Sequence, residues 1–171
     1  MAFDRRKYRD FTAKDLVLTA LMTAIVFLAT FVPHIPIPLG YAHLGDAVIF
    51  LFALLAPRRS ALFAACLGSA LADFMSGFAI WIVPTLVIKL VMAEIVCRTA
   101  RARSRMARIA LAFALASLWM AVVYTLAGAV LYDSFTAALA SLPGLLAEGA
   151  VNSIAALAAL PLLRVRLPRA D

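Results

Sequence analysis

The chain has 171 residues, of which 65% are apolar and 15% charged, and its mean hydropathy is +1.00. Too little polar surface remains to cover a water-soluble globule of this size, so the composition predicts that lipid surrounds most of the chain. The net charge of +7 would favour nucleic acid in a soluble domain, but here the basic residues lie between apolar blocks and at the ends. We therefore expect a membrane protein with the lipid bilayer, and no nucleic acid, as its surroundings.

Six apolar blocks follow one another with short connections, which predicts one domain over residues 1–171. The fold class is an all-α, polytopic membrane protein, a six-transmembrane-helix bundle. Its predicted spans are roughly 16–32, 44–56, 60–72, 80–96, 109–131 and 145–163. The second and third spans reach only about 20 Å at 1.5 Å per residue, against a hydrocarbon core of about 30 Å. We expect their outer ends to open into loops around a cavity.

The basic residues also predict the topology. All Lys and Arg residues except Lys89 lie before the first span, at 58–59, between 98 and 108, or after the sixth span. The opposite connections, 33–43, 73–77 and 132–144, contain no Lys or Arg. The positive-inside rule therefore predicts that the N- and C-termini are both cytoplasmic. The first block is expected to remain as a permanent span, because it is longer than the apolar core of a signal peptide.

Several local patterns have a structural reading. Thr12 and Asp15 predict a capping box at the start of the first span, and Glu94 with Arg98 predicts an i,i+4 surface pair. Ala20 and Ala24 in the first span form a small-xxx-small step, which allows another helix backbone to approach closely in lipid.

Polar and aromatic residues gather on the side that lacks basic residues. The first outer connection has three prolines, which make it stiff, and it supplies Tyr41, His43 and Asp46 for stacking and hydrogen bonding. Asp73 and Trp81 belong to the second outer turn. Asp46 and Asp73 have an equally good structural interpretation as acids at a helix end or turn. These residues are candidates for the wall of a binding cavity.

Lys89 lies inside the fourth span and needs a partner, because an unpaired charge is costly in lipid. The candidate partners are Asp46, Asp73 and Glu148. Glu148 lies about one turn into the sixth span, and Asn152 is four residues further on the same face. A Lys/Asp pair beside an outer cavity would hold a polar small molecule, or it would only lock helices together.

The sequence contains no P-loop, HExxH, acidic metal cluster or catalytic Ser/His/Asp order. We therefore predict no catalytic residue, no metal site and no cofactor, and the chain is not expected to be an enzyme. ATP-driven transport would need another subunit for hydrolysis.

Three motifs carry a family resemblance. The runs PIPLGYAHLGDA at 36–47, GSALADFMSG at 68–77 and PTLVIK at 84–89 resemble the S components of energy-coupling factor (ECF) transporters, most closely the riboflavin, hydroxymethylpyrimidine and pyridoxine branch. The resemblance covers residues 16–94 by motif and the last two spans by hydropathy. It implies a membrane subunit in the bacterial or archaeal cytoplasmic (inner) membrane that captures a vitamin from the outside.

The resemblance also implies partners. These are an ECF transmembrane coupling protein and two cytoplasmic ATPase subunits, with Ala20 and Ala24 at the interface. The predicted ligand is a small water-soluble vitamin, pyridoxine or hydroxymethylpyrimidine-like, with riboflavin or another vitamin as the alternative. The expected substrate-binding residues are Tyr41, His43, Asp46, Asp73, Trp81, Lys89, Glu148 and Asn152. A different class also remains open, a self-sufficient proton-coupled secondary transporter with Glu148 or Asp46 as its proton site.

Overall fold

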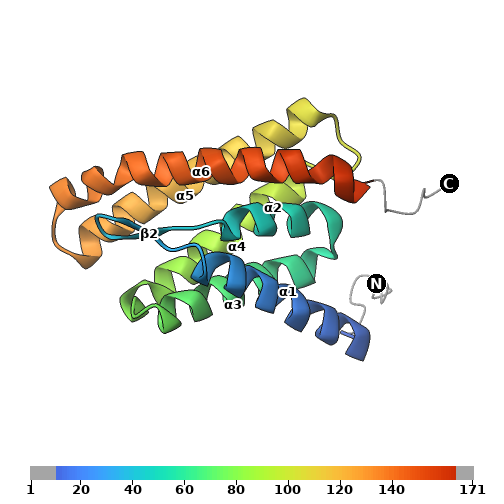
Figure 1. Cartoon of the computed structure of the whole chain (residues 1–171), viewed down its shortest axis with the longest axis horizontal. Helices are drawn as coiled ribbons and strands as arrows, with labels where there is room; N and C mark the ends of the chain where they lie inside the picture. The colour runs from blue at the N-terminus through green and yellow to red at the C-terminus, as the bar shows by residue number, and fades with distance from the viewer. Residues whose placement is uncertain (1–10, 165–171) are drawn as a thin grey trace, which may run out of the picture.

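The computed structural model describes residues 11–164, which form six α-helices and one short β-hairpin (Figure 1). The helices are α1 (Ala13–Phe31), α2 (Gly45–Leu55), α3 (Arg58–Met75), α4 (Ile82–Thr99), α5 (Met106–Leu131) and α6 (Phe135–Arg164). The strands β1 (Ile35–Ile37) and β2 (Gly40–Ala42) lie between α1 and α2, and the 3-10 turn η2 (Ala79–Trp81) precedes α4. The predicted helical bundle is confirmed, but the all-α prediction is wrong in one place, the hairpin.

The hairpin replaces the stiff loop that the prolines predicted. Its strands are antiparallel, with Ile35 opposite Ala42 and Ile37 opposite Gly40, so that residues 38 and 39 make the turn. Ile37 packs on α6 at Gly144, where an added Cβ would lie 2.9 Å from the Ile37 Cγ2 atom. Glycine is therefore required where the hairpin meets α6, since any larger residue would push the strand away.

Two helices differ from their predicted extents. Helix α2 is short, with 11 residues, as expected, but α3 has 18 residues and is therefore about 27 Å long. The helix thus extends beyond the predicted span 60–72 at both ends, and whether it crosses the membrane stays a prediction. Helix α6 begins at Phe135, before the predicted start at Leu145, and continues through Pro143. Most of the predicted connection 132–144 is thus helix.

The start of α1 agrees with the sequence. The Thr12 side chain accepts a hydrogen bond from the Asp15 backbone N–H at 3.2 Å, and the Asp15 carboxylate accepts one from the Thr12 backbone N–H at 3.1 Å. This reciprocal pair is the capping box, and it satisfies N–H groups that have no partner inside the helix.

Helix α2 lies among α1, α3, α4 and α6 and is the centre of the packing (Figure 1). Its Phe50 is fully buried and stacks on Phe113 of α5 with the ring centroids 4.6 Å apart. Ile88 and Met92 of α4 fill the same core. On the other side, α1 packs on α3, where Gly68 lies so close to α1 that a Cβ would come within 2.8 Å of the Thr23 carbonyl oxygen. Large side chains there would separate the two helices.

The outside of the bundle is apolar. Four segments, α1, η2 with α4, α5 and α6, are long and apolar enough to cross a membrane, and α2 is a shorter apolar helix. Many Leu, Val and Ile side chains are exposed. The fractions reach 70% for Val17, 71% for Val83 and 82% for Val130. An apolar surface of this extent is stable in lipid rather than water. Helix α1 is the most open, with only 17% of its apolar stretch buried.

The two ends of the bundle differ in charge. The start of α1, the end of α6 and the connections α2–α3 and α4–α5 lie at the right-hand end of Figure 1, where the arginines gather. There Glu94 of α4 pairs with Arg98 one turn on, as predicted, and also with Arg58 of α3. The hairpin and the connections α3–α4 and α5–α6 lie at the opposite end, which has no Lys or Arg in its loops.

Candidate functional site

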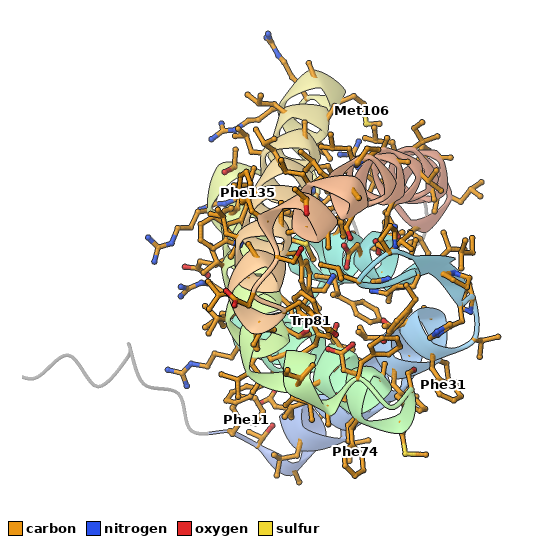
Figure 2. All side chains as sticks on the ribbon, turned by 90° about the vertical axis from the view of Figure 1, so that its left-hand side faces the viewer. Phe11, Phe31, Phe74, Trp81, Met106 and Phe135 are labelled. Carbon is orange, nitrogen blue, oxygen red and sulfur yellow. The ribbon has the colours of Figure 1, made fainter. Side chains whose placement is uncertain are left out.

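A cavity opens at the hairpin end of the bundle. The hairpin, the end of α3, η2, and helices α4, α5 and α6 all contribute to its wall. In Figure 2, which looks from this end, Trp81 lies toward the middle of the bundle, whereas Phe31 and Phe74 lie at its periphery. The polar and aromatic residues in the wall are Tyr41, His43, Asp73, Phe78, Trp81, Thr85, Lys89, Tyr124, Thr125, Ser141 and Glu148.

Lys89 lines this cavity. Of its three predicted partners, it forms an ion pair with Asp46. Its Nζ forms an ion pair with the Oδ1 atom of Asp46 in the first turn of α2, and the two side chains are 1% and 0% exposed. Lys89 Nζ also lies 5.4 Å from the centre of the Tyr124 ring, within cation–π range. The pair joins α4 to α2, and the N-terminal end of the α2 dipole further stabilises the Asp46 carboxylate.

Asn152 holds the segment between the hairpin and α2. Its Nδ2 donates to the carbonyl oxygens of His43 at 2.7 Å and Glu148 at 2.9 Å, and its Oδ1 accepts from the Ala47 N–H at 2.8 Å. The side chain is fully buried, so no water competes for these bonds. Asn152 therefore fixes where β2 ends and α2 begins, and with it the inner edge of the hairpin.

His43 and Glu148 lie in contact beside the cavity. The Gly45 backbone N–H donates to His43 Nδ1 at 3.2 Å, so this nitrogen carries no hydrogen, and it lies 3.1 Å from Glu148 Oε1. The same Glu148 oxygen accepts a hydrogen bond from the His43 backbone N–H at 3.4 Å. Burial, and then the charge of Lys89, lower the pKa of His43 to about 4, which keeps its ring neutral.

Aromatic rings form the outer wall. His34 stacks on Tyr41 with the ring centres 4.0 Å apart and the planes 15° apart, and Phe78 lies 5.4 Å from Tyr41. The Tyr41 hydroxyl donates to Asp73 Oδ1 at 2.9 Å. Burial, and then the Asp73 charge, raise the pKa of Tyr41, so its hydroxyl stays protonated. The hairpin is thus tied to the end of α3.

The wall formed by α4 and α5 is also aromatic and polar. The hydroxyl groups of Thr85 and Tyr124 are 2.9 Å apart, and the Trp81 and Tyr124 rings are 5.5 Å apart. Trp81 Nε1 donates to the Tyr132 hydroxyl at 3.3 Å. Aromatic faces beside polar groups favour contact with a flat ring that has polar edges.

Six of the eight predicted substrate-binding residues line the cavity: Tyr41, His43, Asp73, Trp81, Lys89 and Glu148. Asp46 and Asn152 do not line it, because each is fully buried behind the wall and holds another residue in place. Whether any of the eight contacts a ligand stays a prediction. Four further polar residues line the cavity and were not predicted from the sequence: Thr85, Tyr124, Thr125 and Ser141. The adjacent Tyr124 and Thr125 inside an apolar span were a usable signal.

Ala20 and Ala24 do not line this cavity, and both are exposed on α1. Their role as a partner interface stays a prediction, and the open face of α1 leaves them accessible within the described residues.

Apolar helices around a buried polar cavity define a membrane protein with a site for a small molecule. The model of the ECF-type riboflavin transporter S component family matches residues 10–165, and the chain belongs to this family. The S-component prediction is therefore confirmed. Members of this family are the substrate-binding components of vitamin transporters and work with ECF module components. The family is not a family of enzymes. No curated protein matches the chain.

Proposed function

We propose that the chain is the substrate-binding membrane subunit of an ATP-driven ECF-type importer, which captures a small water-soluble vitamin on the outer side. The observation that carries this proposal is the cavity, which combines stacked aromatic rings with buried polar groups at the end of the bundle without basic loops. A compact pyridine or pyrimidine, as in pyridoxine or hydroxymethylpyrimidine, suits such a wall. Riboflavin is the alternative ligand.

The proposal includes a topology. All six helices cross the cytoplasmic membrane of a bacterium or archaeon, with both termini in the cytoplasm and the hairpin outside. The arginine-rich end then faces the cytoplasm, in agreement with the positive-inside rule. An ECF transmembrane coupling protein would pack on α1 at Ala20 and Ala24, and two cytoplasmic ATPase subunits would supply the energy.

Calorimetric titration of the detergent-purified protein with pyridoxine, hydroxymethylpyrimidine, thiamine and riboflavin tests the binding. Ala138→Leu on α6 would fill the cavity, because Ala138 is buried in its wall, and it should weaken binding at least tenfold. Ala140→Leu is the matched control, because Ala140 lies two residues away and is exposed. Failure of all four compounds on folded protein would remove the vitamin assignment.

Uptake by cells distinguishes the energy source. We expect uptake only when the coupling protein and ATPases are co-expressed. Uptake by the chain alone that stops on addition of a proton uncoupler would instead favour a proton-coupled transporter, for which Glu148 would be the proton site.

A further inference from the structure

Asp73 differs from the other acids of the cavity in having no counter-ion. Asp46 forms an ion pair with Lys89, and the Glu148 carboxyl lies 3.1 Å from His43 Nδ1. Among residues 11–164, no Lys or Arg forms an ion pair with Asp73. Asp73 is therefore the acid of the cavity wall that has no paired cation in this part of the chain.

One oxygen of this carboxylate is also without a hydrogen bond. Asp73 is 8% exposed and lines the cavity, and its Oδ1 accepts from Tyr41, but its Oδ2 has no partner within the described residues. A buried carboxylate oxygen left unbonded costs free energy, and an incoming N–H group would remove that cost. This unbonded oxygen therefore favours a ligand that carries a hydrogen-bond donor.

The surroundings of Asp73 favour the same kind of ligand. Asp73 lies in the last turn of α3, where the negative end of the helix dipole adds to the carboxylate charge and repels an anion. The Tyr41, Phe78 and Trp81 rings border the same space and present faces that attract a flat or positively charged ring.

We propose that this cavity selects a nitrogen heterocycle, neutral or positively charged, that donates an N–H hydrogen bond to Asp73 Oδ2, and that it excludes the phosphate ester of the same compound. The inference rests on the proposed function and specifies the chemistry of its ligand. Asp73 is thereby the residue that determines specificity.

Matched pairs of compounds that differ in one donor test this role by calorimetry. The pairs are hydroxymethylpyrimidine and its deamino analogue, pyridoxine and its benzene analogue, and riboflavin and N3-methylriboflavin. In the pair that the wild type binds, we expect the donor-bearing member to bind about 10- to 100-fold more tightly, as a hydrogen bond to a charged group provides. Its 5′-phosphate or equivalent ester should bind at least 10-fold more weakly.

Asp73→Asn removes the charge but keeps an oxygen for the Tyr41 hydroxyl, so the fold should survive. We expect it to reduce the preference within the pair about 10-fold or more and to relax the exclusion of the ester. Asp133→Asn is the matched control, because Asp133 is exposed in the α5–α6 connection and does not line the cavity, and it should keep the wild-type preference.

Tyr41→Phe gives a second measurement that does not alter the carboxylate. It frees Asp73 Oδ1, so the preference for the donor-bearing compound should persist or increase. An unchanged preference in Asp73→Asn, a preference lost in Tyr41→Phe, or equal binding of the ester by the wild type would overturn the inference and leave the vitamin-binding function standing. Failure of every compound on folded wild-type protein would overturn both.

Discussion

The protein contains two clusters of paired acidic and basic side chains, one buried beside the cavity and the other exposed toward the arginine-rich end. Near the cavity, Lys89 and Asp46 form a pair that is almost completely buried, whereas at the arginine-rich end Glu94 holds Arg58 and Arg98, whose side chains are 56% and 74% exposed. Water and salt can replace a partner in the exposed cluster, but nothing can replace one in the buried pair. Burial, rather than the number of contacts, decides how much each cluster matters.

The largest effect is expected from breaking the buried pair. Lys89→Met leaves the Asp46 carboxylate buried without its cation, which should lower the free energy of unfolding by about 3–5 kcal/mol. Lys89→Met combined with Asp46→Asn removes both charges and should recover most of that loss. Denaturation in detergent micelles would measure both variants. Wild-type stability in Lys89→Met alone would contradict this prediction.

The neutral hydrogen bonds near the cavity should come next. Asn152→Leu keeps the volume but leaves the Ala47 N–H and the His43 carbonyl without their partner, at about 1–3 kcal/mol for each buried group. We expect a total loss of about 3 kcal/mol in the same assay. Ser153→Ala, whose hydroxyl bonds only along the α5–α6 contact, should cost less than about 1 kcal/mol. Equal losses in the two variants would show that Asn152 has no special role.

Acid should weaken the same region. The pKa of His43 is lowered to about 4 by its burial and by Lys89, while the ring in the unfolded chain titrates near 6.5. The unfolded state therefore gains the proton first, so stability is complete above about pH 6.5 and falls as the pH approaches 4. We expect a loss of about 2 kcal/mol between pH 7 and pH 5.

The groups that face His43 are Asp46, Lys89, Glu148 and His34, and they remain in the control His43→Asn. The asparagine oxygen can accept the Gly45 N–H, so this variant should fold and lose the pH dependence in this range. The same slope in both proteins would assign it to another group.

The exposed cluster should give the smallest effect. Glu94→Gln removes the charge that pairs with both arginines, yet we expect a loss below about 1 kcal/mol because the arginine side chains are solvated. Added salt should shrink the difference from the wild type further. A loss as large as that of Lys89→Met would contradict the difference expected between the buried and the exposed cluster.

The sequence predicted the parts of this picture that depend on the cost of charge in lipid. Lys89 in an apolar span required an acid, and the true partner Asp46 was among three candidates. Choosing between them needs the rotation of each helix, which an almost uniformly apolar sequence does not encode. The six helices followed from hydropathy for the same reason.

Other features depend on tertiary contacts. In sequence, the two three-residue strands look like an extended loop, because β1 contains Pro36 and Pro38 lies between them. Packing of Ile37 against Gly144 stabilises them as a hairpin. The start of α6 was missed because Pro143 and Gly144 usually mark a helix end, yet here both lie inside the helix. Arg58 of α3 pairs with Glu94 of α4, and no local sequence pattern indicates this contact between helices.

The openness of α1 has a thermodynamic consequence. A helix with only 17% of its apolar stretch buried leaves most of that stretch uncovered in the isolated fold, and a protein that packs on the folded helix would bind the native chain rather than the unfolded one. Such a partner acts as a ligand of the native state and adds about 2.7 kcal/mol when present at 100 times its dissociation constant. The stability of this chain is then a property of its assembly, and it rises with the concentration of whatever covers α1.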